Sequence, residues 1–115
     1  MQRLRRAGGF MATSPTQRSL KYLRDAGYTV AIVEHWNGFV NKRYDLFGFI
    51  DLLALKGDET LAVQTTSYSN VSARVNKIAD HENVAAVRDA GWSIAVHGWF
   101  KNKSGRWEVR VVDLS

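Results

Sequence analysis

The chain of 115 residues contains no cysteine. It therefore has no disulfide, no thiolate metal ligand and no cysteine nucleophile, which suits a reducing compartment. It also lacks any apolar run near the roughly 18 residues that a membrane-spanning helix needs. The N-terminus is basic but has no apolar core of the signal-peptide kind. These absences predict a cytoplasmic protein with no membrane partner.

Two further signals are weak. The three histidines fall on separate predicted elements, and their spacing is not that of a zinc site. The net charge is +5, of which three arginines within residues 1–12 supply +3, so +2 remains for the rest. A basic excess favours polyanion partners, but a charge of this size is equally typical of ordinary solubilising side chains.

The residues that are present predict one globular domain over residues 13–115. Hydrophobic residues make up 45% of the chain, and its length is enough for a single core. Residues 1–12 are predicted to be a flexible basic leader. Ser14 is a suitable N-cap and Pro15 suits a first helical turn, so a helix is expected over Thr16–Ala26.

Strands and a second helix are expected after Gly27. Runs of β-branched and aromatic residues predict the strands, a tight turn at Gly57 predicts a hairpin, and helical spacing of apolar residues predicts the helix. A polar loop is expected over residues 37–45. The predicted strands are Tyr28–Trp36, Gly48–Leu55, Thr60–Ser67, Trp92–Phe100 and Trp107–Leu114, and the predicted helix is Asn70–Ala90.

The element order α-β-β-β-α-β-β predicts an α/β sandwich, with a mixed central sheet flanked by helices. The first three strands form an antiparallel meander. The helix between the third and fourth strands allows a parallel crossover, which is expected to be right-handed. The last strand alternates in polarity and is predicted to lie at an edge of the sheet.

Polar side chains interrupt the two most hydrophobic strands. Asp51 lies in the stretch GFIDLLAL, and Gln64 and Thr66 lie in LAVQTT. The short turn between the strands brings Asp51 and Gln64 near cross-strand register, and Glu34 ends the preceding strand. A carboxylate in an apolar strand is costly unless it is paired or binds a metal.

These oxygen atoms predict a site for Mg²⁺ or Mn²⁺. Its ligands would be the side chains of Asp51, Glu34 and Gln64 and the backbone carbonyl of Thr65. Asp45 is an alternative to Glu34 as the second carboxylate. A structural role is the other interpretation, because most buried carboxylates are simply paired. In that interpretation Asp51 pairs with Lys42, Arg43 or Arg74, and Gln64 satisfies a neighbouring backbone group.

The pattern of helix, strand, GFIDLLAL, turn, LAVQTT and helix resembles the PD-(D/E)xK nuclease superfamily. The small Holliday-junction-resolvase-like proteins and the virus-type replication–repair nucleases are its most similar members. The resemblance covers most of residues 14–100, with Asp51 at the position of the family aspartate and Gln64 at that of the Glu or Gln. It implies a restriction-endonuclease-like fold and a Mg²⁺-dependent or Mn²⁺-dependent endonuclease.

The same resemblance implies a DNA substrate that is branched or double-stranded, and a homodimer that places two active sites on two strands. A phage or prokaryotic source would put the protein in the bacterial, or host, cytoplasm. The implied catalytic residues are Asp51, Glu34, Gln64, Thr66 and Lys77.

The chain departs from the family at Thr66, which stands where the catalytic lysine is usual. A threonine can hydrogen-bond a water molecule but brings no positive charge to the phosphate. Arg74 or Lys77 on the following helix could replace that charge, and their spacing puts both on one face with His81. The departure leaves a second interpretation open, a weak or inactive nuclease-fold module that binds nucleic acid. A plain structural protein is a third.

Two basic segments are candidates for DNA contact, in addition to Arg74 and Lys77. Both mix cations with planar groups that suit phosphate contact and stacking, although ordinary solvated loops have similar compositions. The first segment contains Asn37, Asn41, Lys42, Arg43 and Tyr44, and the second contains Lys101, Lys103 and Arg106 beside Trp99 and Trp107.

Gln17 on the first helix is a further candidate for the metal site.

Overall fold

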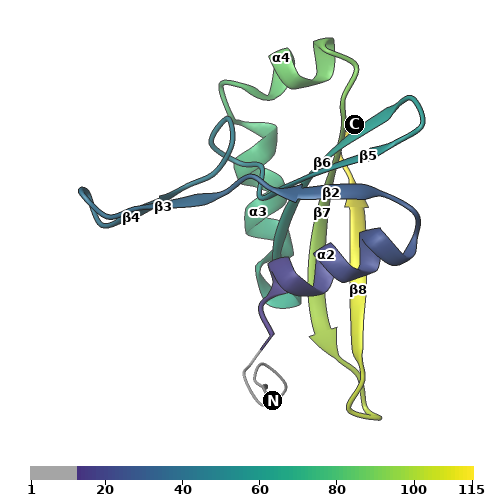
Figure 1. Ribbon diagram of the computed structural model, residues 1–115. Coiled ribbons are helices and arrows are strands. Elements are labelled where there is room, and N and C mark those ends of the chain that lie inside the picture. The colour runs from purple at the N-terminus through teal and green to yellow at the C-terminus, as the bar shows by residue number, and fades with distance from the viewer. Residues whose placement is uncertain (1–12) are drawn as a thin grey trace, which may run out of the picture.

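The computed structural model describes residues 13–115, and Figure 1 shows their arrangement. The predicted leader, residues 1–12, lies outside the described residues. A five-stranded sheet runs through the middle of the molecule with helices on both faces, and a two-stranded ribbon projects to one side (Figure 1). The predicted α/β class with a mixed sheet is confirmed.

The elements follow in the order helix, four strands or strand fragments, a long strand, helices and two further strands. Their bounds are α2 (Pro15–Asp25), β2 (Thr29–Ile32), β3 (His35–Asn37), β4 (Lys42–Tyr44), β5 (Leu52–Lys56), β6 (Glu59–Ser67), η1 (Tyr68–Asn70), α3 (Val71–Ala79), α4 (Val84–Asp89), β7 (Ser93–Lys101) and β8 (Trp107–Asp113). Within residues 13–115, no helix combines the length and the apolar character that a membrane crossing requires.

The large sheet has the strand order β2-β5-β6-β7-β8. Strands β6 and β7 are parallel, with Gln64 opposite Val96, and every other neighbouring pair in this sheet is antiparallel. The predicted hairpin and parallel crossover are therefore confirmed. Strand β8 lies at one edge of the sheet, as predicted.

Helix α2 begins where the sequence predicts, because its first turn is capped locally. The Ser14 hydroxyl accepts a hydrogen bond from the Gln17 backbone N–H at 3.1 Å, and Pro15 occupies the first turn, where it has no N–H to satisfy. Leu20 and Leu23 of this helix are buried against one face of the sheet. Burial of each leucine side chain contributes about 1.5–3 kcal/mol to folding.

The opposite face of the sheet carries a second core under α3 and α4. Val71 and Ile78 of α3 pack with Ile94 and Val96 of β7 in this cluster. Gly98 of β7 allows the close approach of the helix, since a Cβ atom at this position would lie 2.1 Å from Val71 Cγ2. The sheet is therefore covered on both faces, which explains the nearly continuous apolar runs of β5, β6 and β7.

Two predicted strands are shorter than expected. The predicted strand Tyr28–Trp36 ends at Ile32, and residues 35–37 pair instead with residues 42–44. The predicted loop over residues 37–45 is therefore largely a β-ribbon. The predicted strand Gly48–Leu55 begins only at Leu52, because Phe47 and Gly48 have positive φ angles of 54° and 87° and form a turn.

The predicted helix Asn70–Ala90 is interrupted. It consists of the short η1, then α3, and then α4 after a break at residues 80–83. In the break the Asn83 backbone N–H donates to the ring Nδ1 of His81 at 3.1 Å. The Asn83 amide donates to the Phe47 carbonyl at 3.0 Å. These side chains replace helical hydrogen bonds, which a pattern of apolar spacing alone does not reveal.

Candidate metal centre

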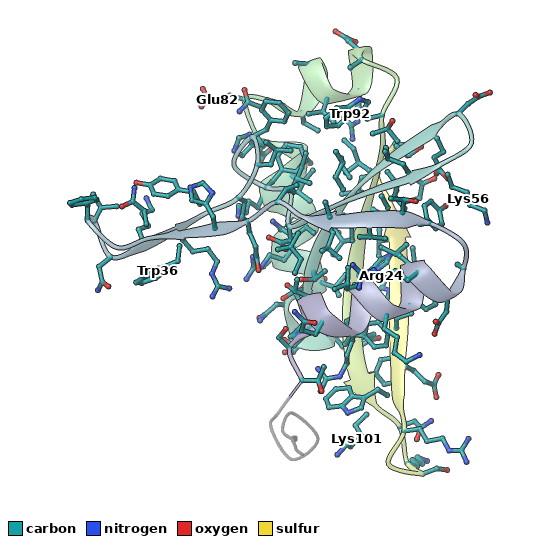
Figure 2. All side chains as sticks on the ribbon, in the orientation of Figure 1. Arg24, Trp36, Lys56, Glu82, Trp92 and Lys101 are labelled. Atoms are coloured by element: carbon teal, nitrogen blue, oxygen red, sulfur yellow. The ribbon has the colours of Figure 1, made fainter. Side chains whose placement is uncertain are left out.

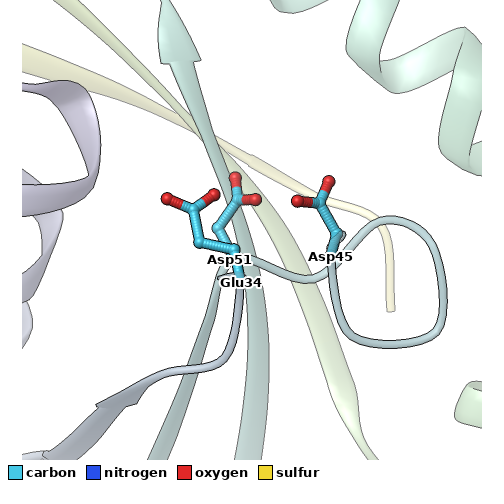
Figure 3. Close-up of side chains that lie close together, drawn as sticks. All are labelled: Glu34, Asp45 and Asp51. Carbon is cyan, nitrogen blue, oxygen red and sulfur yellow. The ribbon is translucent and has the colours of Figure 1, made fainter. Parts of the chain in front are cut away.

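Three carboxylates meet at the end of the sheet where the β3–β4 ribbon leaves the body. Glu34, Asp45 and Asp51 each offer an oxygen atom, and these atoms all lie within 4.8 Å of one another. Figure 3 shows the three side chains pointing to the same side. Glu34 lies between β2 and β3, Asp45 follows β4, and Asp51 precedes β5. Three separate segments of the chain therefore supply one cluster.

Strand β6 fixes the position of Asp51. The Thr65 backbone N–H donates to Asp51 Oδ2 at 2.8 Å, and the Thr65 hydroxyl lies 3.3 Å from the same oxygen. The Asp51 backbone N–H donates to the Val63 carbonyl, and its carbonyl accepts from Val33, both at 2.9 Å. The Asp51 carboxyl group is thus attached to the neighbouring strand, with its second oxygen left for other partners.

The first turn of α2 adds hydroxyl groups to the cluster. The hydroxyls of Thr16 and Thr65 lie 2.8 Å apart, and Thr16 also donates to Glu34 Oε1 at 3.4 Å. The N-terminus of a helix carries a partial positive charge, which favours nearby anions. Helix α2 therefore contributes to the position and the electrostatics of the carboxylates.

The environment opposes ionisation of Asp51. Asp51 is 4% exposed, and its pKa is raised to about 8, chiefly by burial and in addition by the hydrogen bond to Glu34 and the charges of Asp45 and Glu34. The hydrogen bond from the Thr65 backbone N–H acts in the opposite direction. A cation among the three groups would offset the repulsion that raises this pKa.

Two basic side chains lie near the cluster, at nitrogen–oxygen distances longer than those of a hydrogen bond. Arg43 Nη1 lies 3.6 Å from Glu34 Oε1, and Lys77 Nζ lies 4.0 Å from Asp45 Oδ2. No such pair joins a basic residue to Asp51 within the described part of the chain. The structure therefore contradicts one part of the structural interpretation, the pairing of Lys42, Arg43 or Arg74 with Asp51. It confirms the other part, because Gln64 donates a hydrogen bond to a backbone carbonyl.

The donor set fits a hard divalent cation. Carboxylate and hydroxyl oxygens are the ligands that Mg²⁺, Mn²⁺ and Ca²⁺ prefer. Two oxygens on opposite sides of a Mg²⁺ ion lie about 4.2 Å apart, so small side-chain adjustments would bring the cluster to coordination distance. Glu34 and Asp45, which the sequence offers as alternatives for the second carboxylate, are both in the cluster.

The carboxylates open into a polar cavity of about 610 Å³. Its wall includes the N-terminus of α2, the end of β6, and side chains of both the ribbon and α3. The predicted site residues that line it are Gln17, Glu34, Arg43, Asp45, Asp51, Thr65, Thr66 and Arg74. The cavity therefore brings together eight of the side chains that sequence reasoning selected, including all three candidate carboxylates.

Gln64 does not line this cavity. It is 1% exposed, and its amide donates to the Phe49 carbonyl at 2.8 Å. Its Oε1 atom has no hydrogen-bond partner among residues 13–115. Side chains alternate along a strand, and Thr65, not Gln64, faces Asp51. The structure thus places Thr65 where the sequence pattern places the Gln64 ligand.

The predicted cations on the second helix have different positions. Arg74 lines the cavity, whereas Lys77 is not among its lining residues and its Nζ lies 4.0 Å from Asp45 Oδ2. His81 lies beyond the end of α3 and packs against Phe49, with the ring centroids 5.2 Å apart. His81 therefore does not share a helix face with the other two residues, and that prediction is wrong.

The two predicted DNA-contact segments lie apart on the surface. Lys42 and Tyr44 are on the ribbon, where Lys42 Nζ lies 5.6 Å from the centroid of the Tyr44 ring. Lys101 and Lys103 are at the end of the β7–β8 hairpin, which is labelled at Lys101 in Figure 2. Neither segment contributes to the cavity, except through Arg43 of the ribbon.

Sequence reasoning missed Thr16 and Ser67, which also line the cavity. Both are small hydroxyl residues near an element boundary, and nothing in the local sequence separates them from ordinary capping residues.

Comparisons with protein-family models, with curated proteins and with solved structures found no match. The candidate function therefore depends on the geometry and chemistry of the site itself.

Proposed function

We propose that this protein is a metal-dependent endonuclease that hydrolyses phosphodiester bonds in DNA. The observation that carries the proposal is the convergence of Glu34, Asp45 and Asp51 within 4.8 Å in an open polar cavity. Arginine side chains on the wall of the same cavity suit a phosphate-containing ligand. A cation site with anion-binding groups beside it is the arrangement that phosphodiester hydrolysis requires.

The residues of the chain divide into two roles in this proposal. Glu34, Asp45 and Asp51 hold Mg²⁺ or Mn²⁺, which when bound supplies Lewis-acid activation of the phosphate and of a water molecule. Arg43 and Arg74 bind phosphate oxygens, because a guanidinium group donates two parallel hydrogen bonds to such a group. The Thr65 hydroxyl and N–H hold Asp51 in place.

The proposal extends to a restriction-endonuclease-like fold. Its support is the order of elements around the site, in which an aspartate precedes the β5–β6 hairpin and a helix leads to the parallel strand β7. Thr66 lines the cavity where the resemblance places a lysine. Lys77 is the proposed substitute for that lysine, since its ammonium group lies 4.0 Å from Asp45.

A nucleic-acid-binding module without catalysis is the second candidate. The observation that favours it is the wall of the cavity, which includes Thr65 and Thr66 but no lysine from residues 13–115. The arginines of the wall can bind phosphate, but a guanidinium group stays protonated near neutral pH and cannot act as an acid or a base. Such a cavity can retain DNA binding after hydrolysis is lost.

Cleavage of end-labelled branched and linear DNA in Mg²⁺ or Mn²⁺ tests the proposal. The wild-type chain is expected to cut, and both EDTA and Asp51→Asn are expected to reduce cutting at least 100-fold. Asp58→Asn is the matched control, because Asp58 is an exposed aspartate on the β5–β6 turn. Salt-dependent binding without any cleavage would favour the second candidate. Equal cutting by wild type and Asp51→Asn would reject the site.

A further inference from the structure

The β3–β4 ribbon has exposed apolar side chains that nothing in residues 13–115 covers. Phe39 at its tip is 102% exposed, Trp36 is 58% exposed, and Val40 is 56% exposed. Figure 1 shows the ribbon projecting away from the sheet, and Figure 2 labels Trp36 on it. Aromatic side chains of this size are usually buried or held against a partner.

One hydrogen bond and one residue with a positive φ define the turn at the tip of the ribbon. The Asn37 side-chain oxygen accepts from the Phe39 backbone N–H at 2.9 Å, and Asn41 adopts a positive φ of 54°. An asparagine that bonds the backbone two residues on and an asparagine in the left-handed region are both typical of tight turns. The exposed side chains are thus presented on a defined turn between paired strands.

The two faces of the ribbon differ. His35 pairs with Tyr44 and Trp36 pairs with Arg43 across the strands, so these pairs lie on opposite faces. The Arg43 side chain lines the cavity and lies 3.6 Å from Glu34. Trp36 therefore shares a face with the arginine that reaches the carboxylate cluster.

The charge of the ribbon selects the partner. Residues 35–44 contain Lys42 and Arg43 and no carboxylate. Two copies of this segment would repel one another, whereas a polyanion would be attracted. A surface that combines cations with exposed aromatic rings suits a nucleic-acid strand, in which phosphates alternate with flat bases.

We propose that the β3–β4 ribbon binds the unpaired bases of a DNA strand whose backbone enters the cavity. This inference rests on the proposed function, because it takes DNA as the ligand of the cavity. Trp36 stacks on a base next to the phosphate that Arg43 contacts. Phe39 and Val40 at the tip lie against the next bases, which are accessible only where the duplex is open. The substrate class is therefore DNA with unpaired nucleotides, such as a fork or a flap.

Binding of two fluorescent DNAs in EDTA tests the ribbon without any cleavage. One is a linear duplex, and the other is a fork of the same length with 2-aminopurine at its first unpaired position. Wild type is expected to bind the fork at least 10-fold more tightly and to quench the 2-aminopurine fluorescence. The double variant Trp36→Ala/Phe39→Ala is expected to bind the fork about 10- to 100-fold more weakly, as the loss of base stacking predicts, with a smaller effect on the duplex.

Leu55→Ala is the matched control. Leu55 is an apolar side chain, 48% exposed, on the separate β5–β6 hairpin, and it is expected to leave both affinities unchanged. Sedimentation of each variant measures its oligomeric state. A loss of dimers instead of a loss of fork binding would overturn the inference and assign the ribbon to a second copy of the chain. Equal binding of the two DNAs by wild type, or no binding, would also overturn it.

The outcome separates this inference from the proposed hydrolysis. If wild type binds the fork through the ribbon but cuts no DNA with Mg²⁺ or Mn²⁺, the ribbon's role stands and the endonuclease proposal fails. If wild type cuts DNA while the ribbon variants bind forks as tightly as wild type does, the endonuclease proposal stands and the ribbon's role fails.

Discussion

The Thr65 backbone N–H donates a hydrogen bond to Asp51 Oδ2 at 2.8 Å, and the Thr65 hydroxyl lies 2.8 Å from that of Thr16. One residue of β6 thus connects the buried carboxyl group to the first turn of α2. Asp51 is oriented by the neighbouring strand, and no basic side chain among residues 13–115 forms an ion pair with it. This relationship explains how a carboxyl group that is nearly inaccessible to solvent can be retained for binding a cation.

The Thr65 hydroxyl is expected to matter for both stability and activity. Thr65→Val keeps the shape and the backbone N–H but leaves Thr16 and Asp51 each with one partner fewer. The loss is expected to be about 1 kcal/mol of unfolding free energy and about a 10-fold decrease in cleavage rate. Thr65→Ser retains the hydroxyl and serves as the control. Urea unfolding and cleavage rates would contradict this view if both variants behaved alike.

Asp51 is expected to make the metal-free protein less stable as the pH rises. Its pKa is about 8 in the folded chain, above the ordinary value of 3.8, so the folded chain keeps a proton that the unfolded chain releases. Stability from this source is present at low pH and is lost as the pH rises towards 8. Between pH 6.5 and 8.5, unfolding free energy in EDTA is expected to fall by roughly 1–2 kcal/mol for wild type.

Asp51→Asn is the comparison for that measurement, because asparagine can still accept the hydrogen bond from Thr65 but does not titrate. Its unfolding free energy is expected to change little over the same pH range. A wild-type curve as flat as that of the variant would show that Asp51 is ionised without a metal. Asp58→Asn, which changes an exposed carboxylate, is expected to keep the wild-type slope.

His97 is expected to destabilise the fold in acid. It is 2% exposed, and burial lowers the pKa of His97 from 6.5 to about 4. Below pH 6.5 His97 binds a proton in the unfolded chain but not in the folded chain. The free energy of unfolding therefore decreases as the pH falls from 6.5 towards 4. The expected loss from this group is at most about 3 kcal/mol.

The test for His97 uses an Asp51→Asn background, because Asp51 acts in the opposite direction over this pH range. The His97 ring Nδ1 lies 2.9 Å from Ser19 Oγ, and the Trp99 indole N–H donates to the same oxygen at 2.8 Å. His97→Asn can keep a hydrogen bond with Ser19 without a titrating group. Urea unfolding at pH 7 and pH 4.5 should show a smaller pH effect in this variant, and an unchanged effect would assign the acid sensitivity to other groups.

The elements that the sequence predicts well are those specified by adjacent residues. Helix α2 has its cap and its proline within one turn, and the β5–β6 hairpin has Gly57 at its turn with a φ of +57°. The β3–β4 ribbon was missed because its strands are three residues long and enclose Gly38, a composition typical of loops. The break at residues 80–83 was missed because it depends on a contact between Asn83 and the distant Phe47.

The candidate site was predictable in its chemistry more than in its geometry. A carboxylate in an apolar strand marks Asp51 without any structure. The choice between Glu34 and Asp45 could not be made, because it depends on how the ribbon folds back beside β5, and the structure brings both to the cluster. The exchange of Gln64 for Thr65 reflects a break in the strand ladder. Leu52 lies opposite Val63, which would put Asp51 opposite Gln64, but the Asp51 backbone N–H donates to the Val63 carbonyl, and a shift of one residue moves a group to the other face.

Binding of Mn²⁺ to the purified chain at pH 8.5 shows whether Glu34, Asp45 and Asp51 hold a cation. Titration calorimetry of wild type, Asp51→Asn, Asp45→Asn and Asp58→Asn compares the cluster with an exposed control. Wild type and Asp58→Asn are expected to bind Mn²⁺ at a saturable site, and either change in the cluster is expected to weaken that binding at least 10-fold. No saturable binding to wild type, or equal binding by all four proteins, would contradict it.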